Sequence, residues 1–234
     1  MSLINYIPLF TTLFSAYFFL LLFRHWVKNR KSLHVFWWMI GVLCYGAGTL
    51  TESINTVIGY SSVNFKAWYI LGALLGGVPL AQGTVYLLMK RKTANILSLI
   101  VSLVILITTI LVILSPLNTP PAGYVKLNGS LLRWQFIRYF APFINTYAFI
   151  FLVGGAIYSA FLYSKKAQYR SRFFGNVLIA TGGLLPGIGG TYTTMGHVEV
   201  LYVTEFIGIL AIYAGYHIIK NAPSPSLHVS ETAG

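Results

Sequence analysis

Residues 94–114 read ANILSLIVSLVILITTILVIL and contain no ionisable side chain. A helix needs about 20 apolar residues to cross the hydrocarbon core of a bilayer, so this stretch predicts a transmembrane helix. Because the stretch also lacks glycine, we expect it at the periphery of a helix bundle, facing lipid. The whole chain shares this character: 56% of its 234 residues are hydrophobic and 9% are charged. A soluble domain has roughly a quarter of its residues charged, so the composition excludes a soluble protein, and the apolar content excludes a disordered one.

Apolar segments of spanning length recur along the chain. They predict an all-α polytopic membrane protein, a seven-transmembrane-helix bundle over residues 1–220. The tail that follows, residues 221–234 (NAPSPSLHVSETAG), is predicted to be disordered. The predicted spans are residues 4–23, 35–59, 66–89, 94–115, 136–163, 173–194 and 200–219.

Basic residues are distributed unevenly between the two sides of these spans. Since cytoplasmic loops collect Lys and Arg, the bias predicts an N-terminus outside and a C-terminus in the cytoplasm of a prokaryotic plasma membrane. The same bias accounts for the net charge of +12, so no nucleic-acid partner is expected. One side holds Lys66, Lys126, Arg133 and Arg138, and the other holds Arg24, Lys28, Arg30, Lys31, Lys90, Arg91, Lys92, Lys165, Lys166, Arg170, Arg172 and Lys220.

Two of the four glutamates fall inside predicted spans, and the chain has no aspartate. Placing a carboxylate in a span costs roughly 2.5–3.5 kcal/mol on insertion scales, so such residues are usually functional. Glu52 and Glu205 each lie roughly 8–12 Å below the outer surface, at 1.5 Å of rise per residue. If their two helices are neighbours, both carboxyl groups face one cavity, which would bind a small ligand in the outer half of the bundle.

The same cavity is expected to include polar residues from the neighbouring predicted helices. Arg138 is the expected counter-ion, and with it the two carboxyl groups would titrate together. The alternative is structural: a bond from a glutamate to arginine or tyrosine that fixes the register of the helices. The full predicted ligand site is Glu52, Asn55, Arg138, Asn145, Thr191, Tyr192, Tyr202 and Glu205.

The span at 173–194 contains TGGLLPGIGGTYTT from Thr181 to Thr194. Pro186 removes a backbone donor, and Gly187, Gly189 and Gly190 permit a break, so these residues are a predicted hinge that could report ligand occupancy. The alternative is a kinked helix whose glycines serve packing.

No catalytic constellation, metal-ligand spacing or nucleotide-binding motif is present, so we predict no enzyme, metal site or cofactor. A membrane enzyme would have to use Glu52 or Glu205 as its acid or base. Haem between His34 and His217 would require the two side chains to face each other across neighbouring helices. An interfacial position is the simpler interpretation for both histidines.

Four stretches carry a resemblance to a known class of membrane region: RHWVKNRKSLHVFWWMIGVLCYGAGTLTE (24–52), FKAWYILGALLGGVPLAQGTVYLL (65–88), YRSRFFGNVLIATGGLLPGIGGTY (169–192) and VTEFIGILAIYAGYHI (203–218). Together they resemble the seven-helix N-terminal sensor region of prokaryotic membrane histidine kinases. The resemblance implies a sensor of an extracellular ligand or of the membrane state. Fourteen residues follow Lys220, without a kinase or other output domain. We therefore expect a stand-alone sensor that signals through a membrane protein partner.

Two other functions fit the sequence. The chain could be an accessory or structural subunit of a larger membrane complex, with its aromatic and glycine-rich faces packed on other chains, lipids or pigments. It could also be a small proton-linked transporter that uses Glu52 and Glu205, although seven spans do not divide into equal inverted repeats.

The predicted orientation can be tested by cysteine labelling. With Cys44→Ala as background, a cysteine at Asn128 should react with an impermeant maleimide in intact cells. A cysteine at Lys31 should react after the cells are opened, because the basic loops face the cytoplasm. The reverse pattern would contradict this orientation.

Overall fold

The computed structural model describes residues 3–120, 126–165 and 167–222, which form helices joined by short connections. Two elements, η2 and η5, are π-helical, and the other η elements are 3-10 turns. In chain order the elements are η1 (Leu3–Tyr6), α1 (Ile7–Lys28), α2 (Leu33–Val57), α3 (Ser62–Trp68), η2 (Tyr69–Leu74), α4 (Val78–Leu88), α5 (Arg91–Leu114), η3 (Gly129–Leu131), η4 (Gln135–Tyr139), α6 (Phe140–Ala148), η5 (Phe149–Gly154), α7 (Gly155–Ser164), η6 (Ala167–Tyr169), α8 (Arg170–Thr194) and α9 (Val198–Asn221).

Seven helical segments within the described residues are long and apolar enough to cross a membrane, which confirms the predicted fold. The predicted tail lies outside the described residues from position 223 onward. The segments are Leu3–Lys28, Leu33–Val57, Ser62–Leu88, Arg91–Leu114, Gln135–Ser164, Arg170–Thr193 and Val198–Asn221.

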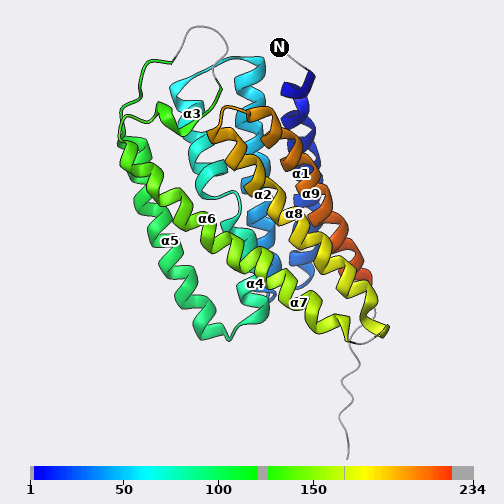
Figure 1. Ribbon diagram of the computed structural model, residues 1–234. Coiled ribbons are helices and arrows are strands. Elements are labelled where there is room, and N and C mark those ends of the chain that lie inside the picture. The colour runs from blue at the N-terminus through cyan, green and yellow to red at the C-terminus, as the bar shows by residue number, and fades with distance from the viewer. Residues whose placement is uncertain (1–2, 121–125, 166, 223–234) are drawn as a thin grey trace, which may run out of the picture.

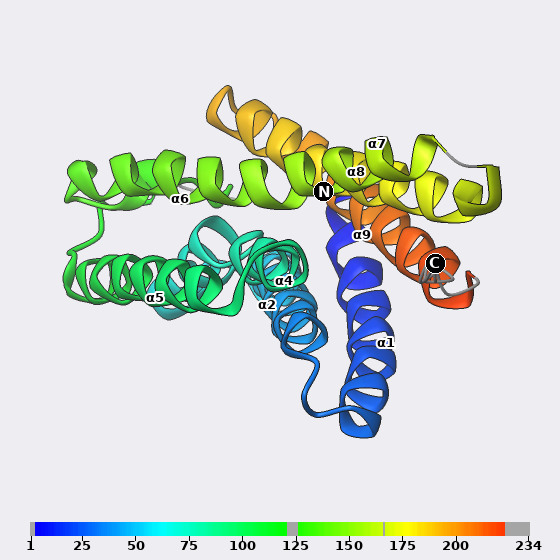
Figure 2. The same cartoon turned by 90° about the horizontal axis from the view of Figure 1, so that it is seen from below.

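Six of these segments pack in a closed order, and α5 lies outside it. Along this order α1 packs on α2, α2 on α4, α4 on the segment containing α6 and α7, α7 on α8, α8 on α9, and α9 again on α1. Figure 2 shows α6 and α7 as one rod along one side of the molecule, running from α5 to α8. The predicted peripheral position of α5 is confirmed, since Leu99, Leu106 and Ile113 are all more than half exposed.

The two ends of the bundle differ in their connections (Figure 1). We call the end with residues 3–6, 58–61 and 115–120 the loop end. The end with residues 29–32 and 89–90 is the basic end.

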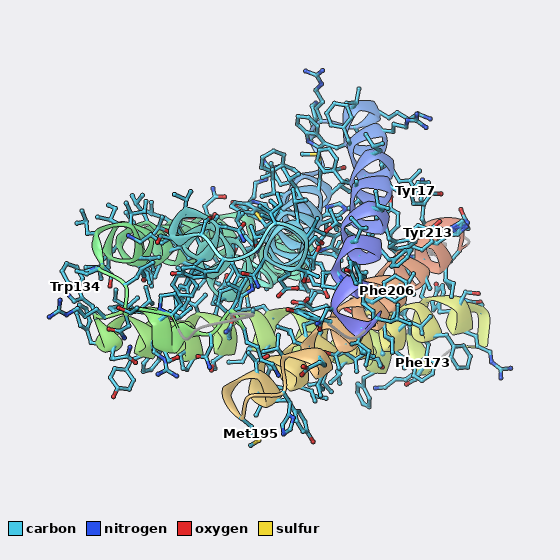
Figure 3. The ribbon with its side chains drawn as sticks, turned by 90° about the horizontal axis from the view of Figure 1, so that it is seen from above. Tyr17, Trp134, Phe173, Met195, Phe206 and Tyr213 are labelled. Carbon is cyan, nitrogen blue, oxygen red and sulfur yellow. The ribbon has the colours of Figure 1, made fainter. Side chains whose placement is uncertain are left out.

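Aromatic rings close the contact between α1 and α9. The Tyr213 ring on α9 packs edge-on against Phe14 and Phe18 of α1, with centroids 5.2 and 5.3 Å apart. Tyr17 and Tyr213 flank the outer side of this interface (Figure 3), with their ring centroids 6.0 Å apart. This packing holds α9 against the first span.

The third span, Ser62–Leu88, is interrupted in its middle. After the π-helical turn η2, residues 75–77 leave helical geometry, and α4 begins at Val78 with Pro79 in its first turn. Gly48 of α2 lies against this region, because a Cβ atom at Gly48 would lie 3.2 Å from the Gly72 Cα atom. The backbone of the third span therefore approaches α2 more closely than side chains would allow.

α8 is one continuous helix with Pro186 inside it, so the chain has no break at Pro186, Gly187, Gly189 or Gly190, and their role as a hinge stays a prediction. The physical reason for this continuity is packing against α9. A Cβ atom at Gly208 of α9 would lie 3.2 Å from the Pro186 ring, so α9 runs directly beside the proline. The alternative interpretation, a helix whose glycines serve packing, describes α8 better.

Glycines at seven-residue spacing line the contact between α8 and α9. On α8 they are Gly175, Gly182 and Gly189, and on α9 they are Gly208 and Gly215. A Cβ atom at Gly182 would lie 2.5 Å from the carbonyl oxygen of Gly208, and one at Gly208 would lie 2.8 Å from that of Gly182. We call this contact the glycine seam; the two backbones meet there directly, as small residues permit in membranes.

The glycine seam can be tested with a matched pair of substitutions in one helix. Gly182→Ala should destabilise the protein by about 1–3 kcal/mol, because the added methyl group forces the helices apart. Gly187→Ala is the control: a Cβ atom there meets nothing within 4 Å, and alanine favours helix by about 1 kcal/mol. Thermal unfolding in detergent compares the two, and equal melting temperatures would contradict the seam.

Candidate functional site

The carboxyl groups of Glu52 and Glu205 meet inside the bundle. Glu52 lies on α2 and is 2% exposed, while Glu205 lies on α9. The two side chains are in hydrogen-bonding contact with each other. Each carboxyl group also has one buried oxygen, Oε2, without a hydrogen-bond partner among the described residues. Their similar depth in the membrane, inferred from the sequence, thus corresponds to direct contact.

Two aromatic side chains hold this carboxyl pair in place. The indole Nε1 of Trp68, at the end of α3, donates a hydrogen bond of 3.0 Å to Glu52 Oε1. The Tyr45 hydroxyl, from α2, donates one of 2.7 Å to the main-chain oxygen of Glu205. The predicted ligand site included neither Trp68 nor Tyr45. The i to i+7 spacing of Tyr45 and Glu52, two helical turns on one face, was the available signal.

The helix that carries Trp68 is itself fixed to α2. Ser61 caps α3 by accepting a hydrogen bond from the Asn64 main-chain N–H, at 3.2 Å. The Asn64 side chain donates to the Thr51 main-chain oxygen at 2.8 Å. Since Thr51 is adjacent to Glu52, this bond sets the height of Trp68 relative to the carboxyl pair.

No basic side chain among the described residues forms an ion pair with either glutamate. The ion pair that the described residues do contain joins Lys126 and Glu199 on the surface, with Nζ and Oε1 2.9 Å apart. The expectation that Arg138 is the counter-ion is wrong, because Arg138 donates to Gln135 Oε1 at 2.9 Å and lies beside Gly129. Arg138 belongs to the short turn η4 at the loop end, not to the body of a long helix.

Contact between two carboxyl groups without a counter-ion constrains their protonation. A carboxylate only accepts hydrogen bonds, so a bond between two carboxyl groups needs at least one proton. Like charges at this separation cannot both be ionised in a medium of low polarity. The carboxyl pair is therefore a proton-binding group.

The remaining residues of the predicted ligand site divide into two groups. Asn55 and Tyr202 are each 1% exposed and lie one helical turn from Glu52 and Glu205, on the same helix faces. By contrast, Asn145, Thr191 and Tyr192 are exposed on the surface. Their assignment to the buried site is wrong, because depth along a span does not determine which face of a helix turns inward.

A polar contact between the first span (η1 and α1) and α2 extends the site. Thr49 and Thr56 share a helix face with Glu52, but their partners on the first span were not predicted. Near the loop end Thr56 donates to the main-chain oxygen of Asn5 at 3.2 Å, and deeper in the bundle the hydroxyls of Thr12 and Thr49 are 2.9 Å apart. Ser15, 1% exposed, has a buried hydroxyl with no partner among the described residues. The spacing of Thr12 and Ser15 on one face of the first span was the available signal.

Closer to the basic end apolar side chains line the interior between α1, α2, α8 and α9, while Gln82 and Thr84 of α4 are buried polar groups. A cavity of about 20 Å³, room for about one water molecule, lies there. Its lining is Phe18, Leu22, Trp38, Val42, Leu80, Leu152, Ile179, Ile212 and Tyr216.

The histidines considered for haem have other neighbours. The His34 ring packs edge-on against Trp38, and His217 Nε2 lies 3.0 Å from the Asn221 side-chain nitrogen. The described residues contain no group of three or more His, Cys, Asp or Glu side chains able to hold a metal ion.

Comparison with protein families, with characterised proteins and with solved structures found no match. The resemblance to histidine-kinase sensor regions therefore stays a prediction.

A double-mutant cycle tests the carboxyl contact. Glu52→Leu and Glu205→Leu should each destabilise the protein, because each leaves the other carboxyl group buried without its partner. The double variant should lose less stability than the sum, by about 1–2 kcal/mol, as neighbouring residues do. Glu52→Leu combined with Glu199→Leu is the control and should be additive. Additive losses in both cycles, measured by unfolding in detergent, would contradict the contact.

Proposed function

We propose that the protein is a seven-helix membrane sensor whose ligand binds at the Glu52–Glu205 carboxyl pair. The observation that carries this proposal is the burial of two carboxyl groups in contact, without a basic partner. Each costs roughly 2.5–3.5 kcal/mol to insert, and such residues in membranes are by default functional.

The position of α9 supports transmission from this site to the basic end. Glu205 lies near the loop end of α9, and Tyr216 lies farther along the same helix, where its hydroxyl is 2.7 Å from His25 Nδ1. A change at the carboxyl pair moves α9 as a rigid body relative to α2. Helix shifts of about 1–2 Å are a common form of switching. The glycine seam permits such a shift of α9 along α8, because glycines on both helices let the two backbones meet there directly.

The distribution of polar groups favours a sensor over a carrier. Polar side chains connect the loop end with the carboxyl pair and Ser15, and Phe18, Val42 and Ile212 then border the apolar cavity. Farther toward the basic end the buried Gln82 bonds to the Tyr147 hydroxyl and to the Ala94 main-chain oxygen. A carrier would need an alternative polar route toward the basic end. The expected sensor lies in a prokaryotic plasma membrane, with its loop end outside.

The exposed face of α8 supports action through a membrane protein partner. A Cβ atom at Gly187 or Gly190 would meet nothing within 4 Å, and Thr181 and Thr191 are exposed beside them. Small and hydroxyl-bearing residues are enriched where transmembrane helices meet. The same face supports the second candidate function, an accessory subunit of a larger membrane complex.

Hydrogen-exchange mass spectrometry in lipid nanodiscs tests transmission without knowledge of the ligand. Glu52→Leu and Glu205→Leu each remove one half of the carboxyl pair and with it the hydrogen bond between the two groups. Each should change amide exchange at residues 29–32 and 89–90 at least 3-fold, because α9 and α2 shift together. Glu199→Leu, which removes an exposed carboxylate, is the matched control and should change nothing there. Changes confined to the neighbourhood of residues 52 and 205 would contradict the sensor proposal.

A further inference from the structure

We infer that the Glu52–Glu205 site takes a monovalent metal cation in exchange for one of its protons. The inference rests on the proposed function and names the class of its ligand. It is argued from the charge of the site, the space within it and the oxygen atoms that it leaves unsatisfied.

Charge neutrality sets the stoichiometry. With both carboxyl groups protonated the site is neutral, as a group buried in a bilayer must be to avoid a large desolvation cost. One monovalent cation that replaces one proton keeps the site neutral. It also keeps one proton for the hydrogen bond between the carboxyl groups. A divalent cation would remove both protons and would leave the two carboxylates without that bond.

The groups around the site supply no competing charge. Tyr45 on α2 and Tyr202 on α9 are its titratable neighbours, and Trp68 faces it from α3. Neither glutamate forms an ion pair with a Lys, Arg or His side chain of the described residues. When one proton leaves the site, a cation from outside is therefore the charge that can balance the carboxylate.

Space and ligand atoms favour a small ion. The carboxyl groups already touch, so a large organic cation would have to separate α2 from α9. The unpartnered Oε2 atoms of Glu52 and Glu205 are two buried acceptors on the two groups. Hard cations bind such oxygen atoms, and buried polar atoms without partners call for a bound ion or water.

Proton release on addition of salt tests the inference with the purified full chain. In weakly buffered detergent solution, NaCl should release about one proton per chain, read with a pH-indicator dye, because metal binding displaces ligand protons. Choline chloride at equal concentration controls for ionic strength and should release none. Glu199→Gln should behave as the wild type, and Glu52→Gln and Glu205→Gln should release none.

Tryptophan emission gives a second readout at the same site. NaCl should shift the emission of the wild type, because Trp68 donates to Glu52, and Trp68→Phe should lose this shift while still releasing the proton. Release by KCl or LiCl in place of NaCl supports the same class of ion. No release with any of the three salts, or release with CaCl₂ alone, would overturn the inference.

The two proposals fail separately. If a change at the carboxyl pair reaches the basic end but salt releases no proton, the sensor proposal holds with a different ligand and the cation inference is overturned. Proton release without transmission would support the cation site and remove the sensor.

Discussion

A proton between two carboxyl groups is the constraint on which the arrangement of the helices depends. Glu52 and Glu205 come from α2 and α9, which are far apart in the sequence, and they touch in the interior without a basic partner. Ionised together they would repel each other with little screening, and the two helices would separate. Protonated, they form the bond that joins α9 to α2, and Trp68 and Tyr45 add one hydrogen bond to each partner.

Close approach of backbones makes this contact possible. Between helices in lipid there is little hydrophobic drive, so packing and hydrogen bonds hold them together. The glycine seam draws α9 against α8, and Gly48 lets the third span approach α2. The third span in turn delivers Trp68 to Glu52. The break after η2 thus lies in the span that contacts the site. The continuous helix α8 packs against α9, which carries Glu205.

The positions of the spans could be predicted from the sequence, but the side of each helix that turns toward the interior of the bundle could not. Seven apolar runs were readable because a bilayer demands length and apolarity from each helix. The sequence placed Glu52 and Glu205 at equal depth, but it left open whether their helices are neighbours and so whether the two carboxyl groups meet. Arg138, Asn145, Thr191 and Tyr192 shared that depth and were misplaced, because the rotation of each helix depends on its neighbours. At Pro186 the sequence left a break and a kinked packing helix open; α8 is continuous there, with α9 packed beside the proline, and the chain leaves helical geometry at Gly76 and Gly77 instead.

Infrared spectroscopy measures the shared proton most directly, and the chain suits it, since it has no aspartate and four glutamates. At neutral pH and without added metal salt the wild type should show the carbonyl stretch of a protonated, hydrogen-bonded carboxyl group. Glu52→Gln and Glu205→Gln should each remove or displace this band, and Glu199→Gln should leave it unchanged. A wild-type spectrum without the band, or a band that neither buried substitution alters, would contradict the account.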